Sequence, residues 1–269
     1  MQLGISSYTF PWAVGMEGYQ PARSLTAFDL LDYAFENEIH FLQIGDNLPL
    51  HLLTEDELLS LKRKADEKKV KLQVGTRGLK QDHVLQYLSI AKALDSSFLR
   101  VVIDDNNFKP PVEKVIQTIR SLLPDLKQSG ICLAIENHDR FTAEILKTII
   151  EQTDRGIVCI CLDTANSFGA GQSIKEVAQI LSPYVINLHV KDFIINRELH
   201  KMGFTIHGCP AGDGVLDIPW LIDKFSNHPK CSVATLEVWS NPEETLEKTL
   251  QKEEAWVEKS IQYLKNKLT

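Results

Sequence analysis

The chain has 269 residues, of which 43% are hydrophobic and 24% charged, so it can form one large domain or two small ones. Its formal net charge is −7 and no long run of like charges occurs, which excludes an obvious surface for nucleic acid or anionic membranes and favours small polar substrates. The N-terminus lacks the pattern of a signal peptide, and no apolar run approaches about 18 residues, so we expect a cytoplasmic protein.

Eight short apolar segments recur along the chain, and most are nearly continuous in Val, Ile and Leu, as is typical of parallel strands covered on both faces. The predicted strands span residues 3–10, 40–47, 72–76, 98–105, 131–138, 156–164, 185–192 and 232–239. Segments with helical periodicity lie between them, at 25–38, 54–69, 111–130, 141–154, 173–181 and 217–225, and a long helix from about 242 to 267 follows.

Eight βα units over this length predict a single (β/α)₈ TIM-barrel domain spanning residues 1–269. Strand counting alone leaves a doubly wound open sheet as the alternative. None of the βα turns carries the G-x-G-x-x-G phosphate fingerprint of such sheets, however, and no linker or low-complexity tract divides the chain. We therefore expect the closed barrel.

The longest connection runs from about Phe193 to Asp217 and contains Arg197, His207 and a glycine-rich segment at 210–214. Connections of this length are usually functional or disordered. This one follows the carboxyl end of a predicted strand, where barrel active sites lie. Whether it closes over the site is left open by the sequence.

The chain has five cysteines, an odd number. Cys132, Cys159 and Cys161 lie in predicted strands, and the other two are Cys209 and Cys231. Cys159 and Cys161 are separated by one residue, and no second close-set pair is present to complete a tetrahedral zinc site. We expect buried free thiols.

Four of the later predicted strands end in an ionisable residue: Glu136, Asp163, His189 and Glu237. Any one of them could close a local salt bridge or cap the following helix. In a barrel, however, neighbouring strand ends converge on one pocket, and three carboxylates that meet there repel one another unless a cation neutralises them. The pattern predicts one divalent metal ion, with Mn²⁺ or Mg²⁺ favoured by the oxygen-rich set and Co²⁺ or Zn²⁺ also compatible.

The segments AIENHD, CLDTAN, NLHVKD, GDGVLDIPWLI and LEVW, in this order, resemble the sugar isomerase/epimerase family of xylose isomerase-like TIM barrels, which also includes endonuclease IV-type enzymes. The resemblance covers essentially the whole chain. It implies that Glu136, Asp163, His189 and Glu237 bind the ion and that the two glutamates act as acid and base. The chain departs from the family at Asn166, where a histidine often stands, so the substrate contact at this position is open.

Resemblance and predicted site together indicate an isomerase or epimerase acting on a sugar, sugar phosphate or polyol in carbohydrate metabolism. Moving a proton on a carbon next to a carbonyl requires an electrophile to stabilise the enediolate, which a divalent ion supplies, and bases, for which we favour Glu136 and Glu237. Further substrate contacts are expected from His138, Asn166, Lys191, Arg197, His207 and Trp239. Plainer roles stay open for these residues: Lys191 could only neutralise the carboxylates, and Arg197 and His207 could be solvated.

Three other functions are weighed against this one. A metal-dependent dehydratase of keto-inositol or dehydroshikimate type begins with the same proton abstraction. An endonuclease IV-like DNA repair enzyme would need several metal ions and a basic groove, which this acidic chain does not suggest. A non-enzymatic sugar-binding barrel would carry no metal. We expect a small-molecule partner, neither nucleic acid nor membrane, and a homo-oligomer is compatible with the sequence.

Overall fold

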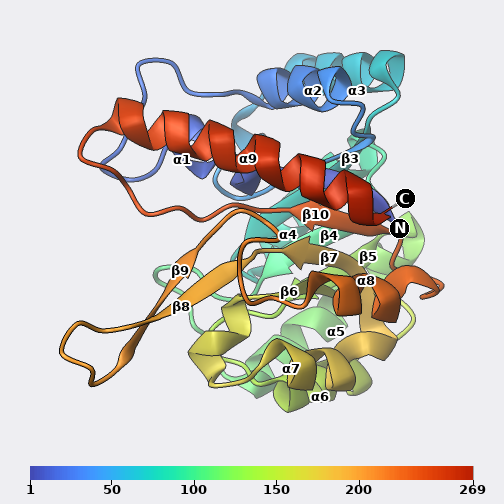
Figure 1. Cartoon of the computed structure of the whole chain (residues 1–269). Coiled ribbons are helices and arrows are strands. Elements are labelled where there is room, and N and C mark those ends of the chain that lie inside the picture. The colour runs from blue at the N-terminus through green and yellow to red at the C-terminus, as the bar shows by residue number, and fades with distance from the viewer. Residues whose placement is uncertain (269) are drawn as a thin grey trace.

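The computed structural model describes residues 1–268 and contains a closed barrel of eight parallel strands (Figure 1). Around the barrel the order is β1, β10, β7, β6, β5, β4, β3, β2. The strands are β1 (Gln2–Ser6), β2 (Phe41–Ile44), β3 (Lys71–Arg77), β4 (Phe98–Val102), β5 (Cys132–Glu136), β6 (Val158–Asp163), β7 (Val185–Val190) and β10 (Val233–Leu236). Each lies within or overlaps one of the eight predicted strands, and the predicted TIM barrel is confirmed.

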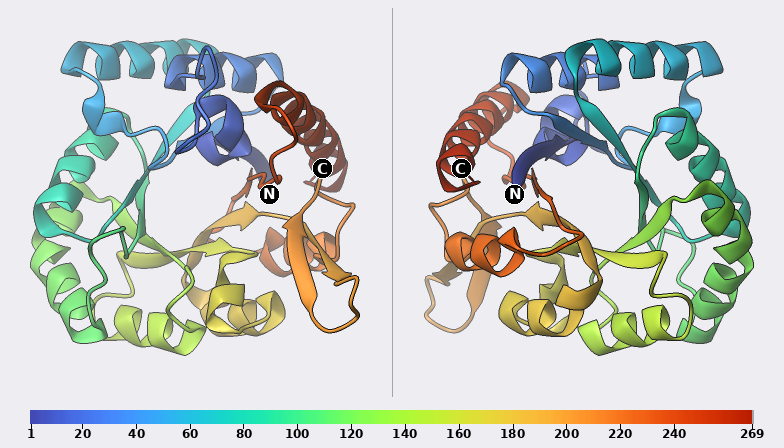
Figure 2. Two further views of the ribbon diagram at one scale, coloured as in Figure 1. Left: turned by 90° about the vertical axis from the view of Figure 1, so that its left-hand side faces the viewer. Right: turned by 90° about the vertical axis from the view of Figure 1, so that its right-hand side faces the viewer.

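Helices surround the barrel as an outer ring (Figure 2). They are α1 (Pro11–Val14), α2 (Ala27–Glu36), α3 (Glu55–Lys68), α4 (Gln81–Ala93), α5 (Val112–Ser129), α6 (Ala143–Glu151), α7 (Ile174–Leu181), α8 (Ile218–Ser226) and α9 (Leu246–Leu268), with 3₁₀ turns η1 (Ser7–Thr9), η2 (Leu50–Leu52), η3 (Asn166–Ala170) and η4 (Ser182–Tyr184). Local sequence sets their starts. In α3, for example, Thr54 accepts a hydrogen bond from the Glu57 backbone N–H while the Glu57 carboxylate accepts one from the Thr54 backbone N–H.

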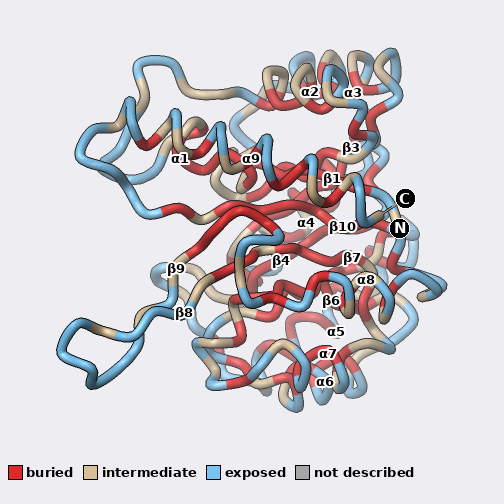
Figure 3. The backbone as a smooth tube through the Cα atoms, viewed as in Figure 1, coloured by how far each residue is buried: buried red, intermediate tan, exposed pale blue. Residues whose placement is uncertain are grey.

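The barrel strands are largely buried (Figure 3). Helices cover them on the outside, and their inward side chains occupy the interior of the barrel. The outward side chains are aliphatic, but part of the interior is polar. Gln43 Nε2 lies 3.4 Å from both Gln73 Oε1 and Asn187 Oδ1, and Asn187 Nδ2 donates to Thr235 Oγ1 at 3.2 Å. This buried polar group of four lies inside the barrel and contacts the candidate site described below.

The predicted connection between Phe193 and Asp217 differs from the expectation of a long loop. It contains an antiparallel hairpin of β8 (Phe193–Arg197) and β9 (Phe204–Gly208), which extends away from the barrel (Figures 1 and 2). The glycine-rich segment after it is held by Asp192, whose carboxylate accepts hydrogen bonds from the backbone N–H groups of Gly212 and Gly214. A Cβ at Gly214 would lie 2.1 Å from Asp192 Oδ1, so these glycines permit a tight loop around a carboxylate.

The five cysteines are free thiols, four of them buried and Cys132 half-buried. Within residues 1–268 no helix is both long and apolar enough to cross a membrane.

Candidate metal centre

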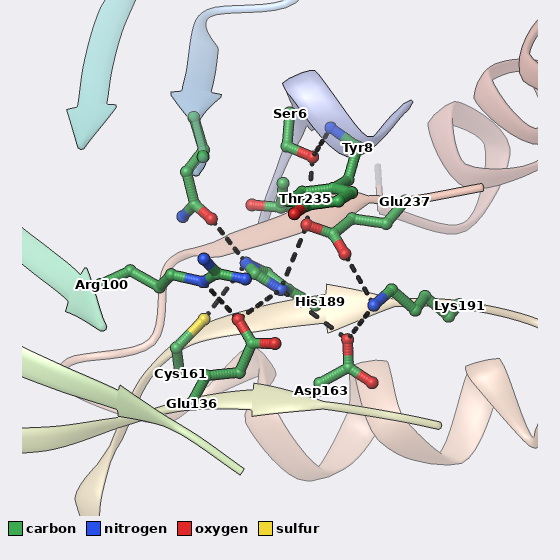
Figure 4. A network of polar contacts seen from close by, with 12 residues as sticks. Ser6, Tyr8, Arg100, Glu136, Cys161, Asp163, His189, Lys191, Thr235 and Glu237 are labelled. Atoms are coloured by element: carbon green, nitrogen blue, oxygen red, sulfur yellow. Dashed lines mark hydrogen bonds and ion pairs between the residues drawn. The ribbon is translucent and has the colours of Figure 1, made fainter. Parts of the chain in front are cut away.

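The structure brings Glu136, Asp163, His189 and Glu237 together at the carboxyl ends of four neighbouring strands (Figure 4). Glu136 and Asp163 are the last residues of β5 and β6, His189 is the penultimate residue of β7, and Glu237 directly follows β10. All four are at most 2% exposed. The sequence therefore predicted which residues meet, because strands with apolar interiors that end in a charged residue point that residue into the barrel mouth.

The imidazole of His189 faces all three carboxylates. Its Nδ1 lies 3.3 Å from Glu237 Oε1, 3.5 Å from Glu136 Oε2 and 3.8 Å from Asp163 Oδ2, yet it has no hydrogen-bond partner. The other ring nitrogen, Nε2, lies 2.7 Å from the side-chain amide oxygen Oε1 of Gln43. This oxygen accepts hydrogen bonds, so it favours the tautomer with the proton on Nε2. The lone pair of Nδ1 then points at three anions, an arrangement that a cation between them would make favourable.

Lys191 is a largely buried cation that contacts two of these carboxylates. Its Nζ lies 2.8 Å from Asp163 Oδ2 and 2.9 Å from Glu237 Oε2, and its side chain is 15% exposed. Burial lowers the pKa of Lys191, but Asp163, Glu237 and Glu136 outweigh that effect and hold the pKa well above its usual value. The ammonium group is therefore charged and partly neutralises two of the carboxylates. Sequence analysis had left this role open for Lys191 beside a contact with substrate.

Arg100 is a second buried cation in the site, on β4 and 2% exposed. Its Nε donates to Glu136 Oε2, and its Nη1 donates to Asp46 Oδ1 at 2.7 Å. Burial opposes ionisation of Glu136, but the charges of Arg100, His189 and Lys191 outweigh it and lower its pKa to about 2. Sequence analysis missed Arg100 and Asp46; the signal was a single arginine inside the otherwise apolar run FLRVV and an aspartate just after β2.

Neutral side chains hold the two glutamates from their other sides. Asn166 Nδ2 donates to Glu136 Oε1 at 2.8 Å, and Ser6 Oγ donates to Glu237 Oε1 at 3.1 Å. Asn166, at the position where family members often have histidine, thus contacts a carboxylate of the cluster directly. Ser6 and Gln43 were not predicted as site residues, because short polar residues on strands carry no distinctive spacing.

The remaining predicted substrate contacts lie farther out. His138 Nε2 is 3.5 Å from Arg77 Nη2, at the mouth of the barrel. Trp239 Nε1 donates to the Asp192 carbonyl at 3.2 Å, and His207 Nδ1 accepts from Asn241 Nδ2 at 2.9 Å. Arg197 is exposed on the hairpin, where Nη1 donates to the Lys201 carbonyl at 2.9 Å. Asn166 and Lys191 are thus brought into the carboxylate cluster, whereas the contacts of His207, Trp239 and Arg197 lie around the hairpin.

The residues at the centre fit a divalent ion on their own geometry. Asp163, His189 and Glu237 each offer one ligand atom within 4.8 Å of the others. His189 Nδ1 is buried without a hydrogen-bond partner, and Asp163 Oδ2 and Glu237 Oε2 are contacted by the Lys191 ammonium. The donor set of carboxylate oxygens and one imidazole nitrogen suits Mn²⁺, Mg²⁺ or Zn²⁺.

Known proteins resemble this chain in sequence and in fold. The sequence profile of the xylose isomerase-like TIM barrel family matches residues 52–267. A 3-oxo-isoapionate decarboxylase from Pectobacterium atrosepticum is 30% identical over 264 residues, which are 98% of this chain and 95% of the relative. A D-psicose 3-epimerase from Clostridium cellulolyticum H10 superposes with a TM-score of 0.73 at 14% identity, covering 100% of this chain and 99% of that one. An IolI protein with a bound zinc atom superposes with a TM-score of 0.67 at 16% identity, covering 98% and 99%.

Proposed function

Because the chain belongs to the xylose isomerase-like TIM barrel family, we propose that it is a metal-dependent enzyme acting next to a carbonyl group of a small polyhydroxylated substrate. We propose further that its reaction is the decarboxylation of a 3-oxo sugar acid. The support is the full-length relative at 30% identity, whose name states that reaction, together with the position of Lys191 at the centre of the site.

In this proposal Glu136, Asp163, His189 and Glu237 hold the divalent ion. The ion would polarise a carbonyl oxygen of the substrate and stabilise the negative charge that develops there. Gln43 fixes the ring orientation of His189, and Asn166 and Ser6 orient the two glutamates through the hydrogen bonds given above.

Decarboxylation requires a proton donor rather than a base. In a 3-oxo acid, cleavage of the bond to the carboxylate carbon releases CO₂ and leaves the electron pair conjugated with the carbonyl group. The carbon that lost CO₂ must then take up one proton. Lys191 Nζ, held charged between Asp163 and Glu237, carries that proton. The position of this ammonium group is the observation that carries the proposal.

An isomerase or epimerase is the second candidate, and one observation favours it. Glu136 and Glu237 approach His189 Nδ1 from strands on either side of β6 and β7, at 3.5 and 3.3 Å. Two carboxylates that flank a bound sugar could exchange protons with it from two directions. Each glutamate, however, already faces a buried cation, Arg100 or Lys191, which suits a ligand better than a proton acceptor.

A substrate panel in D₂O separates these reactions. Protein loaded with Mn²⁺ is incubated with 3-oxo sugar acids and with ketoses, and products are followed by ¹³C and ¹H NMR. We expect CO₂ release from a 3-oxo acid, with deuterium at the carbon that lost it, and no exchange into ketoses. Proton exchange or inversion of a ketose without CO₂ release would refute the decarboxylase and establish the isomerase or epimerase, and loss of water would identify a dehydratase.

A further inference from the structure

A polar cavity of about 360 Å³ lies beside the metal centre, at the carboxyl ends of β2 and β3. Its lining includes Asp46, Thr76, Arg77, Lys80, His83 and Asp105. The volume is in the range of small-molecule sites, which begins at roughly 300 Å³. None of these residues was singled out by sequence analysis.

The cavity shares a wall with the metal centre. Asp46 lines it and accepts a hydrogen bond from Arg100, whose Nε contacts the proposed ligand Glu136. Arg77 lines it as well, and its Nη2 lies 3.5 Å from Nε2 of His138 at the barrel mouth. The cavity is thus linked to the metal centre through Asp46 and Arg100 and to the barrel mouth through Arg77.

The two cations of the cavity are each neutralised by a carboxylate. Arg77 Nε donates to Asp46 Oδ2 at 2.8 Å, and Lys80 Nζ donates to Asp105 Oδ2 at 2.6 Å. A phosphate group is bound by cations whose hydrogen bonds are free to reach it. Here the two carboxylates balance the charges of the two cations, so no excess positive charge is left to attract a phosphate.

The uncharged groups of the cavity match hydroxyl groups. His83 Nε2 lies 2.7 Å from Thr76 Oγ1, and His51 Nδ1 lies 2.8 Å from the hydroxyl of Tyr87. Burial, followed by the charges of His51 and Lys80, lowers the pKa of His83, so its ring is neutral at pH 7. A neutral imidazole both donates and accepts, as do the adjacent hydroxyls, and a sugar hydroxyl has the same double capacity.

We propose that this cavity binds the uncharged, hydroxyl-bearing end of the substrate, so that the substrate is a sugar derivative without a phosphate at that end. The identification of this ligand as the substrate rests on the proposed function; the cavity's preference for a neutral polyol does not.

The test uses two matched probes on the Mn²⁺-free and the metal-loaded full chain: xylitol and its 5-phosphate monoester. Binding is followed by calorimetric titration, which needs no turnover and applies to every variant, and in the native protein also by NMR signals of the His83 ring. We expect xylitol to bind at least tenfold more tightly than the ester. His83→Phe should weaken xylitol binding about tenfold, the loss expected for one neutral hydrogen bond or slightly more, while leaving the Mn²⁺ affinity unchanged.

Charge neutralisation is tested by Asp105→Asn, which frees Lys80 and should tighten binding of the phosphate ester several-fold without affecting xylitol. Asp104→Asn is the matched control, because Asp104 pairs with Arg140 instead. Binding of the ester as tightly as xylitol to the unmodified protein would overturn the proposal, as would turnover of a substrate with no response at His83. Xylitol binding at His83 without any decarboxylation would refute the proposed function but uphold the cavity assignment.

Discussion

Lys191 and a divalent ion are both attracted by the carboxylates of Asp163 and Glu237. With Nζ 2.8 Å from Asp163 Oδ2 and 2.9 Å from Glu237 Oε2, the lysine neutralises part of the negative charge that attracts the ion. Replacing it by methionine keeps much of the side-chain volume but removes the competing charge.

We therefore expect Lys191→Met to bind Mn²⁺ about tenfold more tightly, equivalent to about 1.4 kcal/mol, and to lose CO₂ release because the proton donor is gone. Calorimetric titration measures the first effect and product NMR the second. Lys175→Met, at an exposed lysine that pairs with Asp217, is the control. Weaker metal binding in Lys191→Met would show that the lysine supports the site rather than competing with the ion.

Removal of Arg100 should lower the free energy of unfolding by an amount that can be predicted. Arg100→Met leaves the buried carboxylates of Asp46 and Glu136 without this partner, and breaking a buried pair typically costs about 3–5 kcal/mol. Urea unfolding of the metal-free protein measures the loss. Arg140→Met removes a more exposed pair with Asp104 and should cost less than about 1 kcal/mol. Equal effects of the two substitutions would contradict the structural role assigned to Arg100.

The sequence identified the carboxylates that approach His189, but not Arg100 and Asp46, which support the site through ion pairs. Glu136, Asp163 and Glu237 each follow an apolar run, so their burial needs an explanation that a shared cation provides. Arg100 lies within a run instead of at its end, and its partner Asp46 is distant along the chain. Only the closed barrel brings them together.

At the scale of elements, two residues that were both predicted to contact substrate lie on different elements. Arg197 is exposed on the hairpin and bonds to Lys201, whereas Asn166 begins η3 and donates to Glu136. We expect Arg197→Ala to change kcat/KM less than about twofold, and Asn166→Ala to lower it roughly tenfold or more through loss of one hydrogen bond to a charged group. A large loss in Arg197→Ala alone would show that the hairpin folds over the site during the reaction.

The hairpin itself was missed because the connection was read as one loop. Apolar residues stand together at 193–195, and Phe204 and Ile206 alternate with polar residues beyond the turn that contains Gly203. Ile195 pairs with Ile206 and Arg197 with Phe204, so these side chains share one face of the hairpin. That pattern of two short strands was present in the sequence, but it is too short to outweigh the polar residues between them.

The contact between α9 and α1 contains a buried carboxyl group outside the metal centre. Glu253 on α9 is 1% exposed and accepts hydrogen bonds from the backbone N–H groups of Trp12 and Ala13, at 2.8 and 2.9 Å. Burial raises its pKa from 4.5 to about 7, although these hydrogen bonds lower it. Between pH 4.5 and about 7, the Glu253 carboxyl group is therefore protonated in the folded protein but ionised in the unfolded chain.

Stability should consequently fall as pH rises from about 4.5 to 7, relative to a Glu253→Gln variant that lacks this titration. The relative loss is up to roughly 3 kcal/mol. Urea unfolding of both proteins at pH 5 and pH 8 measures it, with Glu254→Gln at the exposed neighbouring position as control. If the native protein gained stability relative to Glu253→Gln between pH 5 and pH 8, the raised pKa of Glu253 would be contradicted.

At the scale of the whole molecule, eight βα units without a phosphate-binding fingerprint predicted a closed barrel, and the structure confirms it. The barrel closes where β1 pairs with β10, as at Gln2 and Val233, and with β2, as at Ile5 and Leu42. Hydrophobic patterns report local burial, and an open sheet of eight strands would produce the same patterns. Closure is what turns four separate strand ends into one site and places the polar cavity beside it.

The central claim is that one divalent ion binds at Glu136, Asp163, His189 and Glu237. Calorimetric titration of metal-stripped protein with Mn²⁺, alongside Asp163→Asn, tests it most directly, because the substitution removes one anionic ligand while keeping the side-chain volume and an oxygen that can accept from Ala165 and Asn166. We predict one equivalent of bound Mn²⁺ in the native protein and an affinity at least tenfold lower in the folded variant. No binding to the native protein, or an unchanged affinity in Asp163→Asn, would contradict the account.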